Sequence, residues 1–174
     1  MKKSNIQTVS FRRKKEGKTN YKTRIKLITS GKPRLVVRKT LSKIITQIIV
    51  FDVKGDEIKL GVDSTALKKL GWEGSFKSTP AAYLTGYLIG KKCLENKINE
   101  AVFDIGFSTA LKGTKIFAVL KGAIDAGLNV PCSKEVFPSE DRINGKAIKD
   151  FKNNVEEIKG KIKWKKKNSP KKKL

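Results

Sequence analysis

The sequence contains no histidine, and its two cysteines, Cys93 and Cys132, are far apart and in no CxxC spacing. A zinc site would therefore lack its usual ligands, and a nucleophile cannot be paired with histidine within the chain. We expect both cysteines to be small, reduced residues that pack in the interior.

Long apolar runs are also absent. No stretch approaches the roughly 18 apolar residues of a membrane span, and no run of about 7 to 15 apolar residues follows Lys2 and Lys3, as a secretory signal requires. The sequence therefore favours an intracellular protein. Its length of 174 residues and hydrophobic content of 38% predict one globular domain with a modest core.

Negative charge is scarce at both ends of the chain. The 16 acidic residues oppose 40 basic ones, and the net charge of +24 indicates a polyanionic partner, with nucleic acid as the leading candidate. Residues 1–40 hold 14 basic residues and one acid, whereas residues 159–174 hold nine lysines and no acid. Because like charges repel, we expect both ends to be disordered until they meet phosphate.

This distribution predicts three parts. The first 20 residues form a basic N-terminal arm, residues 21–158 form a single α/β RNA-binding domain with a C-terminal helical segment, and residues 159–174 form a lysine-rich tail. Trp164 in the tail is open to two interpretations, since its ring could stack on a base or anchor the tail to the domain.

The first half of the domain predicts three strands. Residues 34–40 and 43–53 are rich in Val, Ile and Thr, which favours an antiparallel hairpin. After a tight turn, apolar and polar residues alternate over 57–63 and predict a third strand with one buried face. A short basic helix is predicted over 21–30, where apolar residues recur at helical spacing.

The second half changes to helical periodicity. Thr79 can serve as the N-cap of a helix that runs to about Asn96, and a second helix lies between Thr114 and Gly127. Between them, residues 101–106 predict a short apolar strand, which implies a crossover and hence a parallel or mixed sheet. An apolar stripe formed by Ile148, Phe151, Val155 and Ile158 predicts a last helix.

Polar and basic residues crowd the connection end of the hairpin. In strand parity Arg34 and Arg38 share a face, and cation, apolar and amide residues alternate from Lys43 to Gln47. Such cations commonly protect an exposed edge strand from aggregation. The alternative is a nucleic-acid contact, for which the candidates are Arg34, Arg38, Lys39, Thr40, Lys43 and Gln47.

The adjoining arm favours the nucleic-acid interpretation. Residues 11–24 interleave Arg and Lys with Phe11, Thr19, Asn20 and Tyr21, which supply phosphate contacts, hydrogen-bonding groups and rings for unpaired bases. The candidate residues here are Arg12, Arg13, Lys14, Lys15, Tyr21 and Arg24.

Signals of catalysis are weak. Residues 106–115 have the ingredients of a phosphate loop but in the order Lys-Gly-Thr, so a helix start at Thr114 is the better interpretation. Asp52, Asp63 and Asp104 lie near strand ends, as the carboxylates of a magnesium-dependent nuclease would, but no paired-acid motif supports them. We expect no catalytic residue, metal or cofactor.

The order of several segments resembles a known family. "YKTR", "GKPRLVVRKT", "QIIVFDVKGD", "STPAAYLTGYLIGKK", "AVFDIG", "KGTKIFAVLKGAIDAGLNVP" and "EVFPSEDRINGKAI" run in the order found in the large-subunit ribosomal protein eighteen family. The resemblance covers roughly residues 11–151 and is to the archaeal type, which is related to the eukaryotic large-subunit ribosomal protein five.

The resemblance implies a mixed five-stranded sheet flanked by helices, of the ribonuclease-H-like type found in components of the translational machinery, without nuclease activity. It also implies a structural constituent of the cytoplasmic ribosome that binds 5S rRNA and attaches it to 23S rRNA in the central protuberance, beside neighbouring ribosomal proteins. The arm and hairpin candidates named above occupy the positions that face 5S rRNA in such proteins.

Two rival hypotheses belong to other classes. A nuclease would use the three aspartates with magnesium and cleave nucleic acid. A polybasic protein held on an anionic membrane surface by the tail would have no use for the equally basic arm and hairpin. We therefore expect RNA partners and no membrane.

Overall fold

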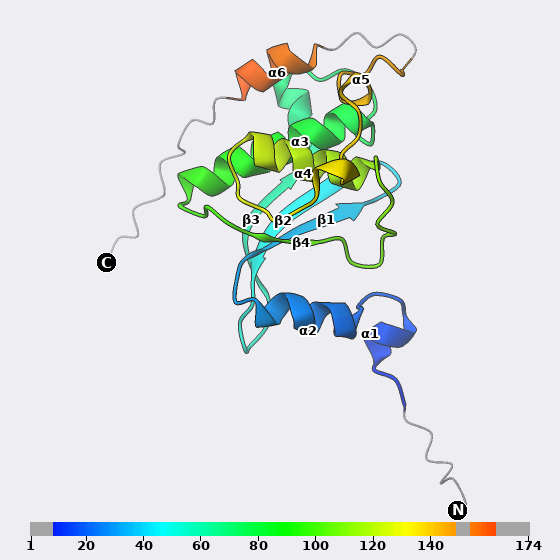
Figure 1. The fold of residues 1–174 in the computed structure, drawn as a ribbon, viewed down its shortest axis with the longest axis vertical. Helices are drawn as coiled ribbons and strands as arrows, with labels where there is room; N and C mark the ends of the chain where they lie inside the picture. The colour runs from blue at the N-terminus through cyan, green and yellow to red at the C-terminus, as the bar shows by residue number, and fades with distance from the viewer. Residues whose placement is uncertain (1–8, 149–153, 163–174) are drawn as a thin grey trace, which may run out of the picture.

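The computed structural model describes residues 9–148 and 154–162 as a mixed α/β structure (Figure 1). Its elements are α1 (Arg12–Lys15), α2 (Tyr21–Thr29), β1 (Arg34–Lys39), β2 (Ile44–Val50), β3 (Glu57–Asp63), the 3-10 helix η1 (Ser64–Leu70), α3 (Thr79–Glu95), β4 (Val102–Asp104), α4 (Lys115–Asp125), the 3-10 helix η2 (Lys134–Val136), α5 (Glu140–Ile143) and α6 (Val155–Lys161). The predicted hairpin, third strand, crossover strand and two long helices are confirmed. The buried face predicted for the third strand is not, since only Val62 is buried and Ile58 is 53% exposed.

The sheet has the order β3-β2-β1-β4, with β1 antiparallel to β2 and parallel to β4. The mixed sheet is as expected, but the described residues form four strands and not five. Beside β4 only a single parallel bridge joins Glu100 to Asn129. Pro131 follows two residues later and has no N–H to donate to a sheet, so this pairing does not lengthen into a strand.

The helices α3 and α4 cover one face of the sheet (Figure 1). The strands contribute Leu35, Val37, Ile44 and Ile48 to the core between them, and all four are buried. The two helices approach closely, because a Cβ on Gly86 would lie 1.9 Å from the carbonyl oxygen of Val119. No side chain fits at that position, so glycine lets the two backbones touch.

Helix starts follow the expected chemistry with one correction. The N-cap of α3 is Ser78 and not Thr79, since the Ser78 Oγ accepts a hydrogen bond of 3.3 Å from the Ala81 N–H. Pro80 is then the second helical residue. Proline fits this position as well as the first, because the first amides of a helix have no intrahelical partner. Thr114 is the N-cap residue of α4, as predicted, although its side chain makes no capping bond.

The last helix is shorter than the apolar stripe predicted. The side chain of Asn154 caps α6 by accepting from the N–H groups of Glu156 and Glu157, so the helix begins at Val155. Val155 and Ile158 are buried as predicted, whereas Ile148 precedes the helix and is 39% exposed. Phe151 lies outside the described residues. The N-cap stops the helix from extending back to the start of the stripe.

The arm and the cysteines bring two further corrections. Residues 9–20, which we expected to be disordered, include the helical turn α1, and the ring of Phe11 lies 5.1 Å from that of Tyr21. Residues 1–8 and the tail from residue 163, with Trp164, lie outside the described residues. Cys93 is fully buried as predicted, but Cys132 is exposed because it lies in the loop after Pro131.

In the part of the chain that the structure describes, no helix is both long enough and apolar enough to cross a membrane.

Candidate nucleic-acid interface

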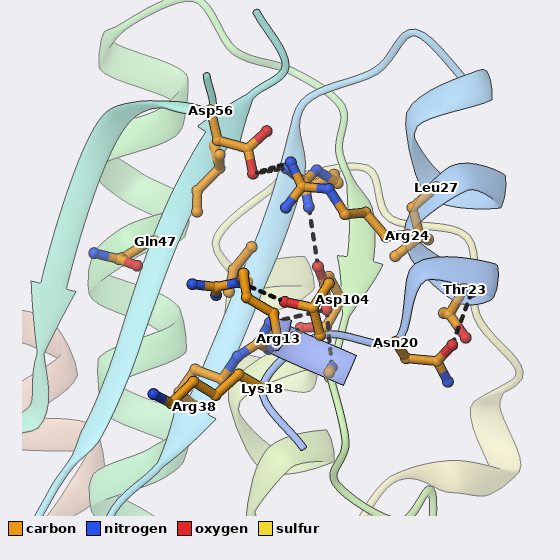
Figure 2. Close-up of a pocket in the computed structure, with 15 residues that line it drawn as sticks. Arg13, Lys18, Asn20, Thr23, Arg24, Leu27, Arg38, Gln47, Asp56 and Asp104 are labelled. Atoms are coloured by element: carbon orange, nitrogen blue, oxygen red, sulfur yellow. Dashed lines mark hydrogen bonds and ion pairs between the residues drawn. The ribbon is translucent and has the colours of Figure 1, made fainter. Parts of the chain in front are cut away.

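A cavity of about 240 Å³ lies on the face of the sheet that α3 and α4 leave open. Its walls come from the arm, from α2 and from alternate residues of β1 and β2 (Figure 2). Five cations line it: Arg13, Lys18, Arg24, Arg34 and Arg38. The strand parity that predicted a shared face for Arg34 and Arg38 is therefore confirmed.

A chain of alternating charges runs through this cavity from Arg24 on α2 to Arg38 in β1 (Figure 2). Arg24 and Arg34 both bind the same oxygen of Asp56, at N–O distances of 2.9 and 2.8 Å. Arg34 and Arg38 then bind the two oxygens of Asp104, at 3.2 Å each. We call this chain of five residues the arginine ladder.

Arg34 is predicted as a surface cation, and of the candidates its observed position differs most from the prediction. Only 4% of the residue is exposed, because β1 lies between β2 and β4 and the residue is covered on both sides. A buried guanidinium must be paired, and Asp56 and Asp104 provide two carboxylates. Arg34 therefore organises the cavity and is not available at its surface.

Arg38 is both anchored and accessible. Its guanidinium donates to the backbone carbonyl of Asp104 at 3.0 Å, yet 43% of the side chain is exposed. Gly106 lies beneath this guanidinium with a φ of +63°, and a Cβ there would lie 2.8 Å from Cζ of Arg38. The Gly106 N–H also donates to Asp104 at 2.8 Å. Glycine thus allows the chain to turn directly against the arginine.

The arm places its other cations around the entrance. The Arg13 Nε donates to the hydroxyl of the buried Thr19 at 2.9 Å, which directs Arg13 toward the cavity. Lys14 and Lys15 are exposed and form no ion pair with any described acid. Arg12 shares Glu16 with Lys18, at 3.5 and 2.8 Å. Most of the arm's positive charge is therefore directed to solvent.

Two aromatic rings accompany these cations. Phe11, 69% exposed, packs at 47° against the half-buried Tyr21 at the start of α2. Exposed aromatic rings beside cations commonly stack on unpaired bases.

The tip of the hairpin has a different architecture. The Thr40 hydroxyl donates to the carbonyl of Lys43 at 2.7 Å and accepts from its N–H, so Thr40 closes the turn. Lys43 binds Asp63 at 2.7 Å, and hydrogen bonds from Lys43 and Thr65 lower the pKa of that carboxyl. The amide of Gln47 lines the cavity with Arg38.

Lys39 is separated from its neighbour Arg38. Successive residues of a strand point to opposite faces, and Lys39 lines a groove beside α4 and not the cavity. The sequence-predicted site is thus divided between two faces of the sheet.

The three aspartates of the nuclease hypothesis are not brought together as a metal site. Asp104 is held by two arginines and Asp63 by Lys43, while Asp52 accepts a backbone hydrogen bond of 3.0 Å in the turn after β2. Among the described residues no group of three or more His, Cys, Asp or Glu side chains could hold a metal ion.

Sequence reasoning missed Lys18, Asp56 and Gly106 as parts of this surface. Lys18 carried a signal, since it lies in the basic arm. Asp56 and Gly106 are an acid and a glycine in connections, and only their contacts with Arg24, Arg34 and Arg38 reveal their role.

Comparison with known proteins places the chain in a family. A family model described as "Ribosomal large subunit proteins 60S L5, and 50S L18" matches residues 5–102 and 95–133. The chain belongs to this family of ribosomal large-subunit proteins. It is also 50% identical over 149 residues to the large ribosomal subunit protein uL18 of Methanothermobacter thermautotrophicus, a match that covers 86% of this chain and 78% of that protein.

The resemblance seen in the sequence, including its archaeal type, is therefore confirmed. Within this L5 and L18 family the protein has a structural role in the large ribosomal subunit.

Proposed function

We propose that the protein binds 5S rRNA through its arm and the open face of its sheet. It thereby helps to attach 5S rRNA to 23S rRNA and to neighbouring proteins in the central protuberance of the cytoplasmic ribosome. Family membership supports the ribosomal setting, and the name of the 50% identical relative, large ribosomal subunit protein uL18, supports this branch of the family.

One observation carries the proposal for the site: five cations from the arm, α2 and β1 surround a single cavity on the sheet face that α3 and α4 leave open (Figure 2). Only two carboxylates, Asp56 and Asp104, lie among them, so the cavity keeps a net positive charge. A phosphodiester backbone supplies the missing negative charge and accepts the hydrogen bonds of the arginines.

The candidate residues then have different roles. Arg12, Arg13, Lys14, Lys15, Arg38 and Lys43 contact phosphates, Gln47 offers its amide, and Phe11 and Tyr21 stack on unpaired bases. Arg24 and Arg34 act as positioning residues, because their guanidinium groups are held by Asp56 and Asp104. Thr40 acts through the turn that presents Lys43.

The division into an arm (1–20), a domain (21–158) and a tail (159–174) is part of the proposal, as is the ribonuclease-H-like type of fold. The mixed order of the four strands and the crossover through α3 support that fold type. As a structural protein of the ribosome the chain needs no catalytic residue, cofactor or membrane.

The test is competitive binding of the purified protein to labelled 5S rRNA, with tRNA and a scrambled RNA of equal length as competitors, at several salt concentrations. We expect 5S rRNA to compete best. The double variant Arg13→Gln/Arg38→Gln should bind more weakly and lower the slope of log K against log salt by roughly 0.7 to 0.9 for each phosphate contact removed.

The matched control is Lys68→Gln/Lys69→Gln, which removes two exposed charges from η1, away from the cavity. If all RNAs compete equally, or if the two double variants behave alike, the proposed site is wrong.

A further inference from the structure

A second basic concavity lies on the other side of the hairpin end. It has a volume of about 610 Å³ and lies between the end of β1, the connection from β4 to α4, and α5. We call it the α4 groove. The side chains that matter here are Lys39, Phe107, Leu111, Lys112, Lys115 and Arg142.

The cations of the α4 groove are poorly neutralised. Lys39 and Lys115 form no ion pair with any acid in the described part of the chain, and Arg142 donates to the backbone carbonyl of Gly113 at 3.0 Å. Lys112 binds Glu135 at 2.9 Å, but both side chains are largely exposed. Burial lowers the pKa of Lys115, and the nearby charges of Lys39, Lys77 and Arg142 lower it further. A bound anion would reduce the repulsion between these cations.

Apolar side chains are exposed between these cations. Phe107 is 54% exposed and Leu111 is 61% exposed, and both line the groove. Surfaces that bind unpaired nucleotides commonly combine cations with an aromatic ring. The cations contact the phosphates, and a base stacks on the ring.

The N-terminus of α4 adds to the positive potential of the α4 groove. Gly113, Thr114 and Lys115 line the groove where the 11-residue helix begins, and a helix N-terminus carries partial positive charge. The Thr114 hydroxyl is buried and has no hydrogen-bond partner among the residues that the structure describes.

We propose that the α4 groove binds a second segment of RNA, so that the protein holds one segment on each face of its hairpin. Arg38 and Lys39 are adjacent in β1 but line the cavity and the α4 groove respectively. One strand end therefore contacts both RNA segments. This inference rests on the proposed function, since it takes the cavity as the site of the first segment, 5S rRNA.

The experiment measures two events separately: binding of labelled 5S rRNA to the protein, and capture of labelled 23S rRNA by the protein already saturated with 5S rRNA. The groove variant is Lys112→Gln/Lys115→Gln, which removes two cations that line the groove, and Phe107→Ala removes the ring without changing the charge. The variant Lys68→Gln/Lys69→Gln removes the same charge elsewhere, and Arg13→Gln/Arg38→Gln tests the cavity.

We expect the groove variant to bind 5S rRNA within about twofold of the parent and to lose about tenfold or more in 23S rRNA capture, because two phosphate contacts are gone. Phe107→Ala should weaken capture by about fivefold or more if a base stacks on the ring. The control variant should capture 23S rRNA as the parent does. Photocrosslinks from a probe at residue 107 in assembled subunits should reach RNA.

The inference is overturned if the groove variant captures 23S rRNA as well as the parent does. It is also overturned if 5S rRNA binding falls equally, which would make the groove part of the first site, or if residue 107 crosslinks to an acidic protein segment. Failure of the proposed function gives a different result, because the parent protein itself then shows no preference for 5S rRNA. In that case, capture of 23S rRNA by the RNA-free protein still tests the groove.

Discussion

Arg34 and Asp104 lie 70 residues apart in the sequence and form an ion pair of 3.2 Å in the wall of the cavity. Parallel pairing of β1 with β4 brings them together, with Val36 opposite Asp104. The same carboxylate holds Arg38, which is accessible to a ligand, and Arg34 continues through Asp56 to Arg24 on α2. The orientation of the proposed RNA contacts thus depends on Arg34 and Asp104, which are buried.

Replacement of Asp104 tests the arginine ladder. Asp104→Asn leaves two guanidinium groups without their shared carboxylate, and we expect the free energy of unfolding to fall by about 3 to 5 kcal/mol, as when one partner of a buried ion pair is removed. The exposed pair between Glu57 and Lys59 provides the control, since Glu57→Gln should cost about 1 kcal/mol or less. Urea unfolding measures both, and equal losses would show that the ladder does not stabilise the fold.

Gly106 tests how Arg38 is positioned. Gly106→Ala combines a strained φ of +63° with a Cβ only 2.8 Å from the guanidinium of Arg38. Gly31→Ala has nearly the same strain, at a φ of +66°, but its Cβ meets no described atom within 4 Å. Each should lose about 1 to 2 kcal/mol of stability from strain, and only Gly106→Ala should also weaken RNA binding. In an Arg38→Ala background this additional loss of affinity should disappear; its persistence would assign it to another cause.

The contact between α3 and α4 predicts a severe effect of a single methyl group. In Gly86→Ala the new Cβ would lie 1.9 Å from the Val119 carbonyl oxygen, so the helices must separate, and we expect a loss of about 3 kcal/mol or more, at the upper end of overpacking effects. A Cβ on Gly160 in α6 would meet no atom of the described residues within 4 Å, and Gly160→Ala should be neutral or stabilise by up to about 1 kcal/mol. Thermal unfolding of the two variants distinguishes a packing effect from helix propensity.

Asp63 predicts a pH dependence at the hairpin tip. Its folded-state pKa is lowered by Lys43 and Thr65, so the carboxylate contributes stability above its ordinary pKa of 3.8, and the contribution is lost as the pH falls through the folded value. Asp63→Asn should therefore lower the free energy of unfolding near neutral pH by a constant amount, about 1 kcal/mol or less for a surface pair. This difference from the parent should vanish in acid. Unfolding over this range measures it, with Asp52→Asn as the control, since Asp52 binds no described cation. A deficit that persists in strong acid would contradict the ion pair.

The two cysteines predict different reactivities. Burial raises the pKa of the Cys93 thiol to about 12, whereas Cys132 is exposed. A thiolate-specific reagent at neutral pH should therefore modify one thiol in the native protein and two after unfolding. Cys132→Ser should abolish the fast reaction. Modification of the native Cys132→Ser variant at the parent's rate would show that Cys93 is accessible.

Several features follow from the sequence because they depend on neighbouring residues. Alternation over 57–63, the β-rich hairpin and the apolar stripes of α3 and α4 each reflect local periodicity, and the structure contains all of them. One correction concerns two similar residues next to each other, since Ser78 and not Thr79 is the N-cap of α3. Another concerns the edge of the sheet, where Pro131 limits the pairing to one bridge and no fifth strand forms among the described residues.

The sequence by itself determined the charge of this protein, its order of strands and helices along the chain, and its family. Only the tertiary structure decided which cations are accessible. Arg34 and Arg38 look alike in the hairpin, yet burial between two strands commits one to carboxylates, while the other remains accessible. Lys115 lies in a nearly neutral stretch of sequence but meets Lys39, Lys77 and Arg142 in space. Electrostatic energy depends on distance in space and on burial, and long-range strand pairing and helix packing set both.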